Sequence, residues 1–230
     1  MTIYYLNLIR AVNRRDAMKT AFSGEALERI PAQDGLDWSN GVARLGRPLW
    51  KGLDRERLIA EGLLAVDSDL PPTHVACNLS HKAAWDTFLA SRSDLAVILE
   101  DDVEPHPRLK GQGLEDALNM PAGVDFLYLI DPGSVPGRLS VRGGQIRHAF
   151  TFAAYALTRH GARVLSKALT PMRHLADFQL PICCFEGQEN WVSRFSLQAH
   201  ESKIKIKAAV SEGLVRPSKL ARVSQLGHGG

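Results

Sequence analysis

The sequence has little cysteine, and its cysteines form no recognisable pattern. Cys77, Cys183 and Cys184 are the three cysteines in 230 residues. An odd and sparse count provides no disulfide framework, and two adjacent cysteines bridge each other only with strain. The chain has no CxxC pair and no cluster of cysteine and histidine that suggests zinc. This cysteine usage is typical of a cytosolic protein.

The sequence also lacks long hydrophobic runs and any large excess of charge. Its longest aliphatic stretches, such as residues 95–99, are far shorter than the roughly 20 apolar residues of a membrane span. The first ten residues carry no basic leader before their apolar stretch, so no secretory signal is predicted there. With 28 Lys and Arg against 25 Asp and Glu, the charge balance does not indicate nucleic-acid binding. We therefore expect a cytoplasmic protein with no nucleic-acid partner.

Apolar runs and amphipathic stretches alternate along the chain. Strands are predicted at residues 3–8, 27–30, 95–99, 124–130, 152–157 and 203–209, and helices at 14–22, 55–66, 75–91, 114–120 and 161–169. A hairpin is predicted around Gly143 and Gly144, and an irregular loop at 31–54. Thr158 is the predicted N-cap of the helix at 161–169. This order predicts one α/β domain with a mostly parallel central sheet flanked by helices. We place the domain at residues 1–210 and a basic tail at 211–230.

Three acidic residues, Glu100, Asp101 and Asp102, directly follow the apolar run at 95–99. A run bounded by charge is typical of a strand buried on both faces, and ligands of open α/β sheets bind at the carboxyl ends of such strands. Clustered carboxylates raise one another's pKa, a cost that a divalent cation removes, and oxygen ligands favour Mg²⁺ or Mn²⁺. Such an ion would attract a diphosphate. The alternative is a solvated acidic turn that complements a helix N-terminus.

Four sequence blocks, taken in order, resemble one enzyme family. They are Tyr5-Leu6-Asn7-Leu8-x-Arg10; Cys77-Asn78-Leu79-Ser80-His81 with Trp85 and residues 95–103; residues 125–129; and residues 154–162, which are followed by Asp177. This pattern resembles glycosyltransferase family 25, the group that includes lipooligosaccharide and collagen galactosyltransferases. The resemblance implies a GT-A-like fold, a UDP-sugar donor, a divalent metal and inversion at the anomeric carbon.

Within this expected reaction, the chemistry of the individual residues suggests their roles. Asp102, assisted by Glu100 or Asp101, would hold Mn²⁺ or Mg²⁺ against the donor diphosphate. A carboxylate base would take the proton of the acceptor hydroxyl, with Asp177 as the first candidate and Asp131 and Glu189 as reserves. Donor contacts are expected from Asn7, Arg10, Ser80, His81, Glu100 and Asp101. For His81, packing beside Trp85 is the alternative.

The resulting hypothesis is an inverting, metal-dependent transferase. It would move a hexose, galactose before glucose, from a UDP-sugar to a saccharide hydroxyl in lipopolysaccharide or other surface-glycan biosynthesis. Basic residues within 203–222 could draw it to an anionic inner-membrane surface with lipid-linked acceptors, and a solvated tail is the alternative. One rival is a non-catalytic sugar-nucleotide-binding module, because Ile9 stands where the family often has Asp. Another is a metal-dependent phosphohydrolase that uses the acidic triplet alone.

Overall fold

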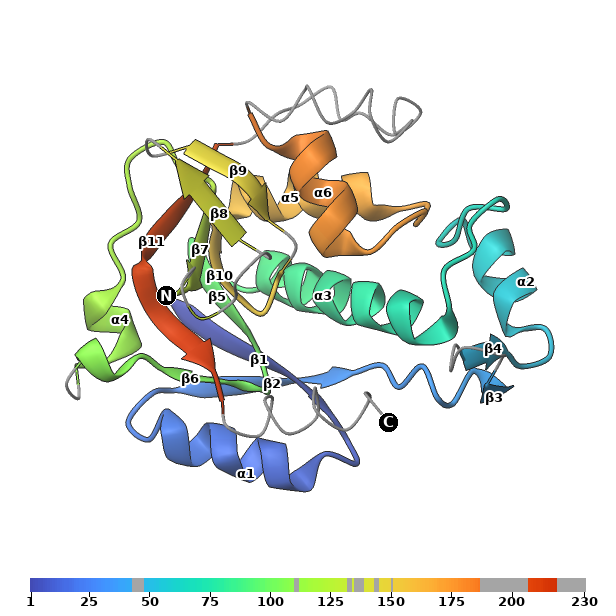
Figure 1. The fold of residues 1–230 in the computed structure, drawn as a ribbon, viewed down its shortest axis with the longest axis horizontal. Coiled ribbons are helices and arrows are strands. Elements are labelled where there is room, and N and C mark those ends of the chain that lie inside the picture. The colour runs from blue at the N-terminus through green and yellow to red at the C-terminus, as the bar shows by residue number, and fades with distance from the viewer. Residues whose placement is uncertain are drawn as a thin grey trace.

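A seven-stranded sheet forms the centre of the molecule (Figure 1). The computed structural model describes residues 1–42, 48–109, 112–131, 134, 139–142, 145–149, 151–186 and 207–218. The strand order is β2-β1-β5-β10-β7-β11-β6. The strands are β1 (Thr2–Leu8), β2 (Leu27–Ala32), β5 (Leu95–Glu100), β6 (Val103–Pro105), β7 (Phe126–Ile130), β10 (Ala154–Thr158) and β11 (Ala208–Pro217).

Five of the seven strands run in the same direction. β1 pairs in parallel with β2 and β5, and β7 pairs in parallel with β11. β10 lies antiparallel between β5 and β7, so β5 and β7 share a direction, and β6 runs antiparallel to β11. The carboxyl ends of β1, β5 and β7 therefore meet at one edge of the sheet. The predicted α/β class with a mostly parallel central sheet is confirmed.

Helices cover both faces of the sheet. They are α1 (Val12–Ala21), α2 (Asp54–Ala60), α3 (Pro72–Ala90), α4 (Leu114–Ala117), α5 (Arg159–Leu169) and α6 (Ala176–Cys184), with a 3₁₀ turn at Pro107–Leu109. Figure 1 shows α1 on one side of β1 and β2, and α3 on the other side together with α5 and α6. In the part of the chain that the structure describes, no helix combines the length and hydrophobicity of a membrane span.

The sheet is apolar because both of its faces are covered. Four of the six residues of β5 and all five of β7 are buried, as expected of a central strand. Phe126 and Tyr155 stack at 4.7 Å between ring centroids, and Phe152 joins them from the segment before β10. Each fully buried side chain of this kind contributes roughly 1.5–3 kcal/mol. This packing fixes the ends of β1 and β5, where the polar residues lie.

Capping and close packing set the position of α5. The Thr158 side chain accepts a hydrogen bond of 3.1 Å from the Gly161 amide, which confirms the predicted N-cap. A Cβ at Gly161 would lie 2.7 Å from the Asp125 carbonyl oxygen, so the helix can approach β7 this closely only with glycine.

Several predicted boundaries are wrong. The 31–54 segment contains a short hairpin of β3 (Ser39–Val42) and β4 (Pro48–Trp50), and the predicted 55–66 helix stops at Ala60, before Gly62 with its φ of +69°. The hairpin at Gly143 and Gly144 forms as β8 (Leu139–Arg142) and β9 (Gln145–Ala149), with the two glycines outside the described residues.

The boundary predicted at residue 210 falls inside β11. Residues 211–217 continue this strand, in which Val215 pairs with Ile130 of β7 and residues 215–217 pair with β6. Leu214 and Val215 are buried. Arg216, one of the basic residues counted in the tail, binds Glu104 on β6 at 2.8 Å. Of the other basic residues within 203–222, only Lys207 lies in the described part of the chain.

Candidate functional site

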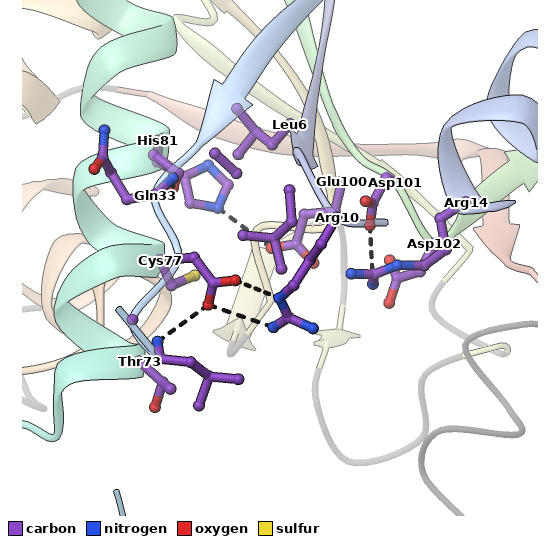
Figure 2. Close-up of a pocket in the computed structure, with 16 residues that line it drawn as sticks. Leu6, Arg10, Arg14, Gln33, Thr73, Cys77, His81, Glu100, Asp101 and Asp102 are labelled. Carbon is purple, nitrogen blue, oxygen red and sulfur yellow. Dashed lines mark hydrogen bonds and ion pairs between the residues drawn. The ribbon is translucent and has the colours of Figure 1, made fainter. Parts of the chain in front are cut away.

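A pocket of about 330 Å³ opens at the carboxyl ends of β1 and β5. The acidic triplet Glu100, Asp101 and Asp102 lines one side of it, and α3 contributes Cys77, Ser80 and His81 to the other. Arg10 and Arg14, which follow β1, add positive charge to its wall (Figure 2). The pocket therefore brings together most of the residues that the sequence singled out.

Asp101 is bound tightly within the protein. Its carboxylate accepts a 2.6 Å hydrogen bond from the Asn7 side-chain amide and forms an ion pair with Arg14 at 2.9 Å. The Asp101 side chain is only 7% exposed. Burial raises the pKa of Asp101, while the Asn7 hydrogen bond and the Arg14 charge act in the opposite direction. Asp101 thus connects the loop after β5 to the end of β1, and its oxygens are already engaged.

Asn7 has the same structural task. It is buried, its amide also donates to the Ala11 carbonyl, and its carbonyl oxygen accepts from Arg29 at 3.0 Å. Asn7 does not line the pocket, so the structure gives no support to the predicted contact between this side chain and a donor. The physical reason is that a polar side chain at a buried strand end needs partners inside the protein.

Glu100 ends a chain of buried hydrogen bonds. Trp85 Nε1 donates to the Tyr155 hydroxyl at 2.8 Å, and that hydroxyl lies 2.9 Å from His81 Nδ1. His81 Nε2 lies 3.3 Å from Glu100 Oε1. Every contact is satisfied when Tyr155 donates to Nδ1 and the Nε2 proton is donated to the carboxylate, a tautomer assigned from this network. His81 both packs beside Trp85 and lines the pocket.

The negative charge of Asp102 is offset less by nearby partners than that of Asp101. Desolvation, followed by the charges of Glu100 and Asp101, raises its pKa from 3.8 to about 7, and Arg14 offsets this only in part. The Ser218 amide donates to the Asp102 carbonyl at 2.6 Å and fixes the backbone. Asp102 and Glu100 offer oxygen ligands on the pocket wall, and a divalent cation would relieve their repulsion. The donor chemistry of these two residues fits Mg²⁺ or Mn²⁺.

The structure also brings together a second group of possible metal ligands, which the sequence analysis did not identify. One ligand atom from each of Cys77, His81 and Glu100 lies within 4.8 Å of the other two, a grouping that was not predicted from the sequence. Cys77 is exposed to the pocket, yet desolvation by surrounding atoms raises the pKa of its thiol, and the charges of Glu100 and Asp177 add to this. The available signal was the spacing of four residues between Cys77 and His81 on one helix.

Ser80 and Arg10 hold the loop after β2 against the pocket. The Ser80 hydroxyl donates to the Ala76 carbonyl at 2.7 Å and accepts from the Gln33 amide at 2.9 Å. The Arg10 guanidinium pairs with Asp34, which raises the Arg10 pKa and lowers the Asp34 pKa. Arg10 is half exposed at the pocket rim, where a ligand can reach it, whereas the Ser80 hydroxyl is occupied.

The candidate bases lie away from this wall. Asp177 stands in the first turn of α6, close enough that its charge adds to the effect of burial on Cys77 and Tyr128. Asp131 follows β7, and its carboxylate is 3.9 Å from His106 Nε2. Neither Asp177 nor Asp131 lines the pocket, and Glu189 lies outside the described residues.

Comparison with curated proteins gives two partial matches, while no family model matches the chain. A glycosyltransferase 25 family member of Anopheles gambiae is 27% identical over 218 residues, which cover 84% of this chain and 33% of that protein. A glycosyltransferase 25 family member of Aedes aegypti is 30% identical over 139 residues, which cover 55% of this chain and 20% of that protein. The chain thus spans a third or less of the curated relatives it matches, and these carry the family name that the sequence blocks suggested.

Comparison with solved structures gives distant similarities. A glycosyltransferase involved in glycosylation of the major capsid of PBCV-1 matches over 98% of both chains with a TM-score of 0.44 and 8% identity. Glucosyl-3-phosphoglycerate synthase from Mycobacterium tuberculosis, in complex with Mn²⁺, UDP and phosphoglyceric acid, matches with a TM-score of 0.38 and 14% identity over 98% of this chain and 72% of that one. The galactosyltransferase LgtC, in complex with donor and acceptor sugar analogues, matches with a TM-score of 0.38 and 9% identity over 95% of this chain and 87% of that one.

Proposed function

We propose that the chain is a metal-dependent glycosyltransferase that transfers a hexose from a UDP-sugar to a saccharide hydroxyl. The observation that carries the proposal is Asp102, an undercompensated carboxyl group on the wall of a pocket at the carboxyl ends of parallel strands. Such a position is where open α/β sheets bind nucleotides. The glycosyltransferase name of the two curated relatives supports the same reaction class.

The pocket residues divide the work between binding and positioning. Asp102 and Glu100 would hold Mn²⁺ or Mg²⁺, which would neutralise the charge that develops on the leaving nucleotide diphosphate. Asn7 and Arg14 keep the Asp101 carboxylate turned inward and so fix the loop that presents Asp102. At the rim, the Arg10 guanidinium offers a planar donor for a phosphate or ribose oxygen, at the expense of its pairing with Asp34.

Inversion at the anomeric carbon needs one base on the acceptor side. We assign this role to Asp177 in the first turn of α6, because its charge reaches the Cys77 thiol, which lines the pocket. Its carboxylate would accept the proton of the acceptor hydroxyl during attack on the sugar. Asp131, held beside His106, is the reserve.

The identity of the sugar and of the acceptor rests on the family resemblance. Because that family includes lipooligosaccharide galactosyltransferases, we expect galactose as the transferred hexose, with glucose as the second candidate. The expected acceptor is a lipopolysaccharide or other surface-glycan precursor. A cytoplasmic enzyme of this kind would meet lipid-linked acceptors at the inner membrane. The basic residues of the segment 203–222 would provide the attraction to an anionic surface.

A UDP-release assay with Mn²⁺, UDP-galactose or UDP-glucose and a panel of saccharide acceptors tests the proposal. Wild-type protein should release UDP only with an acceptor and the cation. Asp177→Asn should bind UDP as well as wild type does and lose at least 100-fold in transfer, because general-base catalysis contributes about 10²–10⁴-fold. Unimpaired transfer by this variant would place the base elsewhere.

Three results would contradict the proposal or its parts. Donor binding with no turnover on any acceptor would favour a non-catalytic module of the same fold. Release of inorganic phosphate from simple phosphoesters would favour a phosphohydrolase. Equal turnover with and without a chelator would remove the cation from the mechanism. Asp94→Asn is the matched control for carboxyl loss, since Asp94 is exposed just before β5, at the end of the strand opposite Asp102.

A further inference from the structure

We propose that Cys77, His81 and Glu100 form a zinc site that opens into the pocket. The three residues bring a thiol, an imidazole and a carboxylate to one place from two rigid elements, α3 and β5 (Figure 2). The ligand set is distinct from the oxygen pair Glu100 and Asp102, although Glu100 belongs to both. The inference does not rest on the proposed transfer reaction, because the metal and its ligands are tested without donor or acceptor.

The geometry requires only a small contraction. Cys77 and His81 are four residues apart on α3, so their side chains lie on one face of the helix, next to the end of β5. His81 Nε2 and Glu100 Oε1 are already 3.3 Å apart, and all three ligand atoms lie within 4.8 Å of one another. Metal–ligand lengths of about 2.0–2.3 Å in a tetrahedral site place such atoms roughly 3.5 Å apart.

The types of ligand select zinc over magnesium. Mg²⁺ requires oxygen ligands in an octahedron, whereas thiolate with imidazole and carboxylate suits a tetrahedral Zn²⁺. Three protein ligands leave the fourth position free, and here that position faces the pocket, since all three residues line it. An open fourth position is typical of zinc sites that bind water or an anionic ligand.

A hydrogen-bond partner for the second ring nitrogen of His81 is already in place. A metal-bound histidine usually donates its other ring proton to a fixed acceptor. His81 Nδ1 lies 2.9 Å from the Tyr155 hydroxyl oxygen, which is held by Trp85 Nε1 at 2.8 Å and has a second lone pair for this proton. Zinc binding would therefore move the imidazole proton from Nε2 to Nδ1, and the Tyr155 hydroxyl would turn from donor to acceptor in this contact.

Charge balance also favours a cation here. The thiolate of Cys77 and the carboxylate of Glu100 would neutralise Zn²⁺, and the Cys77 thiol proton would be released to solvent. Asp177 and Asp102 add further negative charge near the Cys77 thiol. The same charges attract Zn²⁺.

Cobalt provides the spectroscopic test. Titration of the full 230-residue chain with Co²⁺ should produce a thiolate-to-cobalt charge-transfer band in the near ultraviolet that saturates at one equivalent. Zn²⁺ should remove the band, and Mg²⁺ added in place of Co²⁺ should produce none. Cys77→Ser should abolish it, while the double variant Cys183→Ala/Cys184→Ala should retain it. Absence of the band in wild type, or its persistence in Cys77→Ser, would overturn the proposal.

Thiol chemistry provides a second, independent readout. Zn²⁺ should slow alkylation of Cys77 by iodoacetamide at least tenfold, measured by mass spectrometry of the Cys77 peptide. Glu100→Gln should weaken Zn²⁺ binding at least tenfold and reduce this protection. Because His81 is buried, His81→Gln is interpreted only where its thermal transition remains cooperative. Equal alkylation with and without Zn²⁺ would refute the site even if the transferase assay succeeds, and protection would support it even if that assay fails.

Discussion

Replacing Asp102 with asparagine should stabilise the protein in the absence of a cation. The folded state raises the pKa of Asp102 to about 7 through desolvation and the charges of Glu100 and Asp101. The folded protein therefore binds more protons than the unfolded chain between about pH 4 and pH 7, and its stability falls as the pH rises through this window. The amide that replaces the carboxyl group cannot ionise, so the variant escapes this loss.

The magnitude follows from the size of the pKa change. A rise from 3.8 to about 7 corresponds to at most about 4 kcal/mol above pH 7, at about 1.4 kcal/mol for each tenfold change in the acid constant. Solvent in the open pocket screens part of this, and the repulsion is shared with Glu100 and Asp101. We expect Asp102→Asn to raise the free energy of unfolding by roughly 1–2 kcal/mol at pH 8, or about 2–8 °C in Tm for a domain of this size.

Thermal unfolding of both proteins from pH 4 to pH 8 in a chelating buffer measures this difference. The two Tm values should converge at pH 4 and separate as the pH rises. Asp94→Asn should show no such divergence, because Asp94 is exposed and lies outside the acidic cluster. A variant that is no more stable than wild type at pH 8 would refute the idea that ionised Asp102 is a cost to the folded state without a cation.

Two further substitutions test the packing around the site. Asn7→Ala should lower the free energy of unfolding by about 2–3 kcal/mol, because it removes a charge-assisted hydrogen bond to the buried Asp101 carboxylate. The control Asn40→Ala should change it little, because Asn40 is exposed. Equal denaturant midpoints for Asn7→Ala and wild type would contradict the structure. Gly161→Ala should destabilise by about 1–3 kcal/mol, because the new Cβ would meet the Asp125 carbonyl. Without that contact, the change within a helix would stabilise by about 0.5–1 kcal/mol, so the sign of the shift in urea unfolding decides the matter.

The strands of the central sheet were predictable because their apolar runs report burial directly. The runs at 95–99 and 124–130 became β5 and β7, and Thr158 signalled the start of α5. The pattern fails where tertiary contacts decide. Prolines at 171 and 181 hide α6 in the sequence, and Ala208–Pro217 forms a long strand only because β7 and β6 supply its partners.

The site was predicted as a cluster of acids, and the cluster lines a pocket as expected. The division of labour within it was not predictable, because it depends on contacts between distant residues. Asn7 reaches Asp101 across 94 positions and turns a predicted ligand contact into an internal one. Likewise, His81 meets Glu100 only when α3 packs on the sheet, and this places Cys77 beside both.

Calorimetric titration of UDP with and without Mn²⁺, on wild type, Asp102→Asn and Asp94→Asn, shows whether Asp102 holds the cation that binds the nucleotide. We expect tight binding to wild type and Asp94→Asn only when Mn²⁺ is present, and at least a tenfold loss of affinity in Asp102→Asn. Near-normal, Mn²⁺-dependent affinity for UDP in Asp102→Asn would show that this carboxylate does not hold the cation.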